Sequence, residues 1–233
     1  MKSKIIAIIP ARGGSTRVKN KNIKIFNKKP IISQVISKLR KSKLFLNIYV
    51  STDSDKIKKI SNKSGAIVPF KRSQLLSNDF SSSRDVVNNM IKFLEKEKIK
   101  FDFVCCVYPT SIFITNKLLT KAFELLKRNK SKFIFGAIPF SSPIERSFKL
   151  NKKNHVSADM PKKYLRTHTN KLENSYFDAG QFYLGNKSNF LRKVPVFQKG
   201  NIALKFNPYS CIDINNLDDW KFAETIFKYK KLS

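Results

Sequence analysis

The first hydrophobic segment of the chain is continuous and does not alternate with polar residues. Residues 4–10 form an apolar, largely β-branched run that ends at Pro10. Such a run predicts a strand that is buried on both faces, as strands of parallel sheets are. After a glycine-containing loop, apolar residues recur at helical spacing over residues 30–39, and residues 47–51 predict a second strand. The chain therefore begins as a strand, a helix and a second strand.

The same alternation continues through the first 140 residues. Further helices are predicted at residues 53–61, 83–98 and 115–129, the first two with Asp or Ser caps, and further strands at residues 67–70, 101–108 and 132–139. This order predicts an α/β protein with an open, mostly parallel central sheet flanked by helices.

The second part of the chain has a different pattern. Residues 140–175 are polar and irregular, with Pro143, Pro161 and weak strand signals, and predict an inserted arm or an oligomer contact. Strands at residues 176–184 and 203–206 and a helix at residues 217–229 then return the chain to the sheet. Because no linker divides the chain, residues 1–233 are predicted to form a single domain with an arm at about 140–175.

The charge balance limits the classes of partner. With 47 Lys and Arg against 16 Asp and Glu, the formal net charge is +31, which fits an anionic partner and argues against a basic substrate. Only nine of these residues are arginine, and the lysines are spread along the chain. A general lysine bias therefore explains the charge better than a nucleic-acid footprint, which remains the alternative.

The cysteines and the start of the chain argue against several other classes. Cys105, Cys106 and Cys211 form no CxxC pair and are not at metal-ligand spacing from His155 or His168, which argues against a disulfide scaffold and a structural zinc site. The apolar run before Pro10 is too short for a signal peptide or a membrane span. We expect a cytoplasmic protein with no membrane partner.

The loop after the first predicted strand carries the candidate chemistry. It contains neither GxGxxG nor GxxxxGK, so dinucleotide binding and a Walker-type NTPase lose support. It does contain Gly13-Gly14-Ser15, whose backbone N–H groups can approach an anion, next to Arg12, Arg17, Lys19 and Lys21. Ligands of open α/β sheets bind at such loops. The loop predicts a polyphosphate site, with a solvated basic loop as the alternative.

Six stretches in one order then point to a known family. IIAIIPARGGSTRVKNKNIK closely resembles the opening motif of the acylneuraminate cytidylyltransferases, which activate nonulosonic acids with CTP. VSTD at residues 50–53, VPFKRSQLLSND at 68–79, CCVYPTS at 105–111, YFDAGQFYLG at 176–185, and DIN with LDDW near the end follow. CCVYPTS and YFDAGQFY look most like the pseudaminic acid branch. The resemblance implies the nucleotide-diphospho-sugar transferase fold (GT-A, Rossmann-like) with a protruding dimerisation arm, and a homodimer.

The resemblance also implies the nucleotide site. The expected CTP-binding residues are Ala11, Arg12, Gly13, Gly14, Ser15, Arg17, Lys21, Asn22, Arg72 and Ser82. Arg12, Lys21 and Asp213 are the expected catalytic residues, the two cations neutralising charge on the α-phosphate and on the departing pyrophosphate. The alternatives are a surface role for Arg72 and a helix cap for Ser82.

The implied sugar and metal sites use later stretches. The expected sugar-binding residues are Tyr108, Thr110, Ser111, Asp178, Gln181 and Tyr183. Strand alternation leaves two choices: Gln181 and Tyr183 face the cleft with Phe182 in the core, or the reverse. The expected metal is Mg²⁺ at Asp213 and Asn215, where Asn215 supplies an oxygen without charge. Asp218 and Asp219 fit the first turn of the last helix.

The implied reaction transfers CMP from CTP to the anomeric hydroxyl of a nonulosonic acid, with pseudaminic acid preferred, and releases pyrophosphate for glycan biosynthesis. Legionaminic or sialic acid differs only in the sugar pocket, and the STR triplet at residues 15–17 resembles the KDO cytidylyltransferases. A nucleic-acid-binding protein is the alternative from another class. An inactive relative is a further alternative, because Thr16 replaces a lysine and Asn215 an aspartate of the family pattern.

Overall fold

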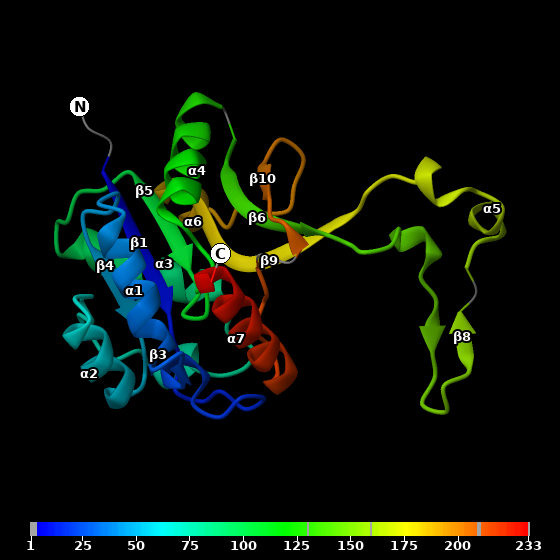
Figure 1. Ribbon diagram of the computed structural model, residues 1–233. Coiled ribbons are helices and arrows are strands. Elements are labelled where there is room, and N and C mark those ends of the chain that lie inside the picture. The colour runs from blue at the N-terminus through cyan, green and yellow to red at the C-terminus, as the bar shows by residue number, and fades with distance from the viewer. Residues whose placement is uncertain (1–3, 130, 159, 209–210, 233) are drawn as a thin grey trace.

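A six-stranded sheet lies at the centre of the computed structural model, which describes residues 4–129, 131–158, 160–208 and 211–232 (Figure 1). Its strands lie in the order β10 (Ile202–Lys205), β6 (Phe133–Pro139), β9 (Tyr176–Asn186), β5 (Phe103–Val107), β1 (Ile5–Pro10) and β4 (Ile48–Ser51). β1 pairs in parallel with β4 and β5, and β10 with β6, whereas β9 is antiparallel to both neighbours. The predicted mostly parallel sheet is confirmed.

Helices cover both faces of this sheet. They are α1 (Ile31–Lys41), α2 (Asp55–Lys63), α3 (Ser83–Lys96), α4 (Asn116–Arg128) and α6 (Lys187–Leu191). Alternate residues of β1 separate into two buried clusters. Ile5, Ala7 and Ile9 pack with α1, α2 and α4, whereas Ile6 and Ile8 pack with α3 and α6. The continuous apolar run therefore supplies both layers, as expected for a strand buried on both faces.

The last helix, α7 (Leu217–Leu232), packs on a small hairpin of β2 (Ile25–Phe26) and β3 (Lys29–Pro30). The ring of Phe26 contacts Trp220 edge-on, with centroids 5.4 Å apart. Val18 of the first loop and Ile214 before the helix are buried in the same cluster. This apolar contact holds two segments almost 200 residues apart side by side, and both carry predicted site residues.

One predicted strand is wrong. Residues 67–70 form no ladder, and the segment touches the sheet only through bridges from Ile67 to Tyr49 and from Lys71 to Thr52. Pro69 between them has no N–H to donate, so the hydrogen-bond ladder cannot continue through it.

The predicted arm projects away from the sheet, leaving after β6 and returning at β9 (Figure 1). It contains η3 (Ile144–Arg146), β7 (Lys149–Leu150), β8 (Val156–Ala158), α5 (Lys162–Leu165) and η4 (Thr169–Lys171). Phe148, Leu150, Val156 and Leu165 are all more than half exposed, at 58%, 52%, 56% and 59%. The arm is thus built of short elements with few buried residues of its own.

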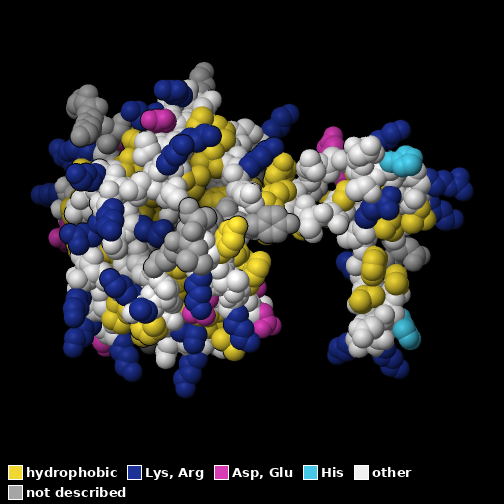
Figure 2. All heavy atoms as spheres, in the orientation of Figure 1, with side chains coloured by type: hydrophobic (Ala, Val, Ile, Leu, Met, Phe, Trp, Pro, Cys, Tyr) yellow, Lys and Arg dark blue, Asp and Glu magenta, His cyan; other side chains and the backbone are white. Residues whose placement is uncertain are grey.

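The basic side chains are spread over the visible face of both the body and the arm, with few acidic ones between them (Figure 2). Among the helices in the described part of the chain, none combines the length and the apolar composition needed to cross a membrane.

Candidate active site

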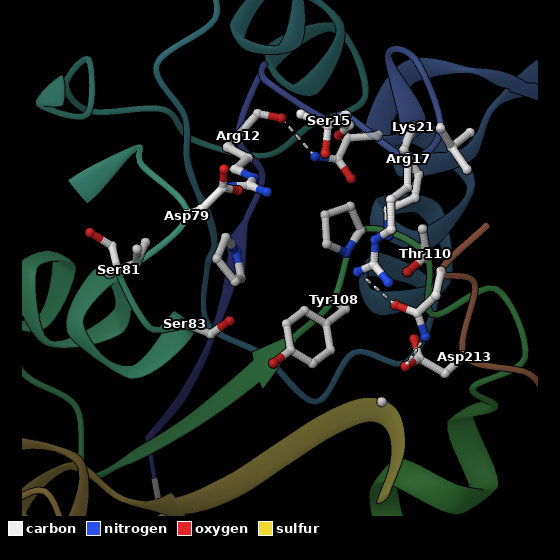
Figure 3. Close-up of a pocket in the computed structure, with 18 of the residues that line it drawn as sticks. Arg12, Ser15, Arg17, Lys21, Asp79, Ser81, Ser83, Tyr108, Thr110 and Asp213 are labelled. Atoms are coloured by element: carbon white, nitrogen blue, oxygen red, sulfur yellow. Dashed lines mark hydrogen bonds and ion pairs between the residues drawn. The ribbon is translucent and has the colours of Figure 1, made fainter. Parts of the chain in front are cut away.

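A pocket of about 390 Å³ opens where β1 and β5 end at the carboxyl edge of the sheet. This is the edge at which open α/β sheets bind ligands. Segments from five parts of the chain line it. Figure 3 labels lining residues from four of them. The predicted residues that line it are Arg12, Ser15, Arg17, Lys21, Asn22, Arg72, Tyr108, Thr110, Asp178, Tyr183, Asp213 and Asn215.

The first loop bends back on itself to point Lys21 into the pocket. Asn20 takes a left-handed conformation (φ 55°), a conformation that asparagine tolerates better than most residues, and η1 (Lys21–Ile23) begins immediately after it. The side-chain amide of Asn22 donates to the carbonyl of Arg12 over 2.8 Å, which closes the loop. Lys21 Nζ donates to the carbonyl of Ile214 over 2.8 Å and thereby ties the loop to the segment before α7.

Three cationic side chains surround the same space. Burial lowers the pKa of Lys21, and the nearby Asp213 carboxylate partly offsets this effect. Arg17 donates to Asn215 Oδ1 over 3.3 Å, and Arg12 forms an ion pair of 2.6 Å with Asp79. These cations come from one short loop but contact two other segments, residues 78–79 and 214–215, so the pocket has a strongly positive side.

Two of the amide groups predicted to cradle phosphate already have protein acceptors. The Gly13 N–H donates to Asp53 Oδ1 over 2.8 Å, and the Ser15 N–H donates to the Gly13 carbonyl over 3.0 Å. Neither Gly13 nor Gly14 lines the pocket, although the Ser15 residue does. The first loop therefore presents mainly side-chain cations to a ligand here, and the expected backbone cradle is not formed by these two amides.

Arg72 is a buried residue of the pocket wall and not the surface arginine of the alternative reading. Its exposed fraction is 4%, its Nε donates to Ser77 Oγ over 3.1 Å, and its guanidinium lies 3.6 Å from Asp53 Oδ1. Burial lowers the pKa of Arg72, whereas the charge of Asp53 raises it.

Asp53 connects the first loop to the buried guanidinium, because it contacts both Gly13 and Arg72. Sequence reasoning missed this role because the Asp53-Ser54-Asp55 run was interpreted as a helix cap. The cap is Ser54, which accepts from the Ile57 N–H.

The candidate metal ligands lie beside Lys21, which is bonded to the Ile214 carbonyl between them. Asn215 Nδ2 donates to Asp213 Oδ2 over 2.7 Å, and both side chains are half-buried. Burial raises the pKa of Asp213, whereas the hydrogen bond from Asn215 and the charge of Lys21 lower it. Asp219 accepts the N–H groups of Asn215 and Asn216, which confirms that it belongs to the start of α7.

A bulge in β9 shapes the sugar side of the pocket. Its register with β6 jumps from the Phe135–Tyr183 pair to the Ala137–Asp178 pair, so four residues of β9 lie opposite one of β6. Gly180 in this bulge has φ +58°, and a Cβ there would lie 2.6 Å from Asp213 Cγ. Because Asp178 and Tyr183 are five positions apart, a regular strand would point them to opposite faces. The bulge instead brings both to the pocket, where the Tyr183 hydroxyl donates to Asp178.

Six predicted site residues lie outside this pocket: Gly13 and Gly14, described above, and Ala11, Ser82, Ser111 and Gln181. Ala11, Ser111 and Gln181 are buried, with exposed fractions of 0%, 0% and 1%. Ser111 Oγ donates to the Gln181 carbonyl over 2.6 Å, and the Gln181 amide donates to the Ile212 carbonyl over 3.2 Å, so both brace the wall from behind. Phe182 lies in the hydrophobic core and its neighbour Gln181 is buried as well. Neither of the two alternation patterns predicted for residues 181–183 is therefore correct. Ser82 caps α3 through the Asp85 N–H, the alternative reading given above.

Two tyrosines form the wall opposite the cations. The rings of Tyr108 and Tyr183 meet edge-on, with centroids 5.8 Å apart. Burial raises the pKa of Tyr108 to about 12 and also raises that of Tyr183, so both hydroxyls stay protonated at neutral pH. The wall thus combines apolar ring surface with neutral hydrogen-bonding groups.

Sequence reasoning missed the polar lining supplied by residues 78–83. Asp79, Ser81 and Ser83 line the pocket together with the Asn78 residue (Figure 3). The signal was present, since Asp79 ends the VPFKRSQLLSND stretch and a serine run follows it. From the sequence, however, only Ser82 of this run was expected at the site, and it caps α3 instead.

Comparisons with known proteins identify the family of the chain. A family model described as "Cytidylyltransferase" matches residues 6–209. The chain is 36% identical over 225 residues to a pseudaminic acid cytidylyltransferase of Campylobacter jejuni, covering 97% of both chains. It is 28% identical to a CMP-N,N'-diacetyllegionaminic acid synthase of Legionella pneumophila, again with 97% of both chains covered.

A solved structure has a similar fold. CMP:2-keto-3-deoxy-manno-octonic acid synthetase, solved in complex with CTP, superposes with a TM-score of 0.70, covering 98% of this chain and 100% of the other. The sequence identity is 13%, so this likeness concerns the fold alone.

Proposed function

The chain belongs to the cytidylyltransferase family, and we propose that it transfers CMP from CTP to the anomeric hydroxyl of pseudaminic acid and releases pyrophosphate. It is therefore a nucleotidyltransferase. The observation that carries the proposal is the pocket, which the cations Arg12, Arg17 and Lys21 line together with the Asp213 carboxylate. The similarity to pseudaminic acid cytidylyltransferase over nearly the full length of both chains supports the choice of sugar.

In this proposal, the cations of the first loop bind the triphosphate. The anomeric hydroxyl oxygen of the sugar forms a bond to the α-phosphorus and loses its proton to solvent, while the bond to the bridging oxygen breaks and pyrophosphate leaves with that electron pair. Charge builds on the phosphoryl oxygens and on the leaving group, where fixed cations lower the barrier most. Lys21 is suited to this role because its ammonium is held by the Ile214 carbonyl, next to Asp213.

The Mg²⁺ implied by the sequence resemblance fits the donor atoms present. No cluster of three or more His, Cys, Asp or Glu side chains suited to a metal occurs among the described residues, so an ion here would take few protein ligands. Mg²⁺ is commonly bound by one or two carboxylates together with phosphate oxygens and water. Asp213 offers such a carboxylate. The Asn215 side-chain oxygen accepts a hydrogen bond from Arg17 in this structure. It would therefore bind the ion only after rotation of the side-chain amide. When bound, the ion would polarise the phosphate.

The sugar would bind against the tyrosine wall. Tyr108 and Tyr183 offer ring surface to the apolar parts of a deoxy sugar, and Thr110 and Asp178 offer polar groups for its hydroxyl or acylamino substituents. Legionaminic and sialic acids share the carboxylate and the anomeric hydroxyl and differ from pseudaminic acid where this wall would contact them. The choice of sugar is thus a property of the wall and not of the phosphate side.

The test measures pyrophosphate release from CTP and Mg²⁺ with pseudaminic, legionaminic and N-acetylneuraminic acids and KDO in parallel. We expect turnover with pseudaminic acid, at least about tenfold above the other sugars, the discrimination that a few pocket contacts supply. Asp213→Ala should abolish it, and Asp218→Ala, at a side chain that is 92% exposed, should not. Turnover with another sugar alone would correct the substrate, and no release with any sugar would contradict the proposed activity.

We further propose that the protein acts as a homodimer assembled through the arm. Phe148, Leu150, Val156 and Leu165 present apolar surface that a free monomer would leave in water. Leu165→Asp should shift the protein to monomers in analytical ultracentrifugation. Leu46→Asp, at an equally exposed residue of the body (54%), should have no such effect. A monomeric parent protein would contradict the proposal.

We also propose a cytoplasmic location. The support is that Cys105 and Cys106 are buried free thiols, as is usual in a reducing compartment.

A further inference from the structure

The Arg12 guanidinium already has an anionic partner. Its NH1 group lies 2.6 Å from Asp79 Oδ1 and also donates to the Asn78 carbonyl over 3.2 Å. Both partners belong to residues 73–82, here called the 73–82 loop, which connects the buried Arg72 to α3. Asp79 and Arg12 both line the pocket, and Figure 3 shows the carboxylate directed at the guanidinium.

The loop presents Asp79 from a turn that is organised by its own residues. Asn78 Oδ1 accepts the N–H groups of Phe80 and Ser81 over 3.0 and 2.8 Å, and Asn78 Nδ2 donates to the Leu75 carbonyl over 3.0 Å. Asp79 therefore does not need Arg12 to hold the shape of the turn. The turn can move as a unit if the ion pair opens.

Little apolar packing holds the outer part of this loop to the body. Leu75 and Phe80 are 82% and 96% exposed. Besides the half-buried Leu76, the contacts that reach the pocket are polar: the bonds from Arg12 to Asp79 and to the Asn78 carbonyl, and the bond from Arg72 Nε to Ser77 Oγ. Segments with few buried apolar contacts open at low free-energy cost. Loss of the contact between Arg12 and Asp79 would therefore separate the 73–82 loop from the loop that carries Arg12.

We propose that Asp79 holds Arg12 while the pocket is empty and that the triphosphate of CTP competes with this carboxylate for the guanidinium. This inference rests on the proposed function, in which Arg12 binds phosphate. A phosphate at Arg12 would lie close to the Asp79 carboxylate, and the repulsion between them favours withdrawal of the carboxylate. Nucleotide binding then frees the 73–82 loop from Arg12, so binding and loop release are coupled.

The exposure of the pair sets the size of the effect. The side chains of Arg12 and Asp79 are 33% and 69% exposed, so water and salt screen the attraction. An ion pair of this kind corresponds to a change of roughly two- to fivefold in an equilibrium constant. A carboxylate held this weakly can be displaced by a multiply charged phosphate chain.

The first experiment compares Asp79→Asn with Asp55→Asn by calorimetric titration with CTP. Asp55 is the matched control because it also forms an exposed ion pair, with Lys71 over 2.8 Å, and is not part of the pocket lining. Both variants gain one unit of positive charge. Asp79→Asn should bind CTP roughly two- to fivefold tighter than Asp55→Asn, and the two should bind cytidine equally. Equal or weaker CTP binding by Asp79→Asn would overturn the inference.

A second measurement reports on the loop itself. Phe80→Trp places a fluorophore at a side chain that is 96% exposed, and the background from the single natural tryptophan, the buried Trp220, is subtracted with the parent protein. CTP should change the emission of Trp at position 80, and adding Asp79→Asn should produce much of that change without nucleotide. Unchanged emission at saturating CTP would contradict loop release.

The two proposals fail in different ways. If the parent protein and every variant fail to bind CTP, the proposed function is wrong. If all of them bind CTP with the same affinity, the proposed function stands and the competition by Asp79 is wrong.

Discussion

The two walls of the pocket are built in opposite ways. The phosphate wall comes from one stretch of the first loop, residues 12–22, and its side chains reach out to distant partners such as the Ile214 carbonyl and Asn215. The sugar wall takes Tyr108 from the end of β5 and Asp178 and Tyr183 from a bulge in β9. The phosphate wall depends on several cations that are close together in the sequence, whereas the sugar wall depends on the register of β9 in the sheet. The first should therefore be sensitive to loss of charge and the second to loss of shape.

Removal of a cation should have the largest effect. Lys21→Met should lower the kcat for pyrophosphate release by about 10³-fold, because a fixed charge next to the α-phosphate acts mainly in the transition state. Lys19→Met is the matched control, since Lys19 lies in the same loop, is exposed and does not line the pocket. Similar losses in the two variants would indicate a general charge effect, contrary to the proposed role of Lys21.

Distortion of the bulge should come second. In Gly180→Ala the new methyl group would meet the Asp213 carboxyl group at 2.6–2.9 Å, in a backbone with φ +58°. We expect a loss of about 10²-fold in kcat, because catalytic groups tolerate little displacement, and a loss of about 2 kcal/mol in the free energy of unfolding.

Gly200→Ala separates these two effects. Gly200 also has a positive φ, of +89°, but no heavy atom lies within 4 Å of the Cβ site. This variant should lose about 1 kcal/mol of stability in chemical denaturation and keep full activity. A comparable loss of activity would mean that backbone strain alone, and not the contact with Asp213, explains Gly180→Ala.

Loss of one hydroxyl in the sugar wall should have a smaller and more selective effect. Tyr183→Phe removes the donor to Asp178 and leaves the Gly180 N–H, 3.2 Å from the same carboxylate, in place. We expect the KM for the sugar to rise by about three- to tenfold, in the range of a single hydrogen bond, with the KM for CTP unchanged. A change confined to the KM for CTP would contradict the division into two walls.

The pH dependence should show the smallest but most direct contrast. Burial lowers the pKa of Lys21, whereas it raises the pKa of Tyr108 to about 12 and that of Tyr183 as well. As the pH rises, the ammonium therefore loses its charge before either hydroxyl ionises. We expect kcat to fall on the alkaline side while the KM for the sugar stays constant. Lys21→Arg should move the fall in kcat to higher pH, and an unmoved profile would assign it to another group.

The sequence alone determined the layers of the fold and the phosphate wall. The apolar run of residues 4–10 and the helical spacing of the following segments suffice for a sheet covered on both faces, because burial follows local periodicity. The cations of residues 12–22 were identifiable because they are adjacent in the chain and follow a predicted parallel strand.

Only the tertiary structure decided the sugar wall and the partner of Arg12. Alternation along a strand predicts faces only where the register is regular, and the β9 bulge buries Gln181 and Phe182 together while it turns Asp178 and Tyr183 to the pocket. The register of β9 depends on its pairing with β6 across an arm of more than 30 residues, and Asp79 reaches Arg12 across 67 positions of the chain. Local patterns contain no information about such long-range pairings, which packing of the whole sheet determines.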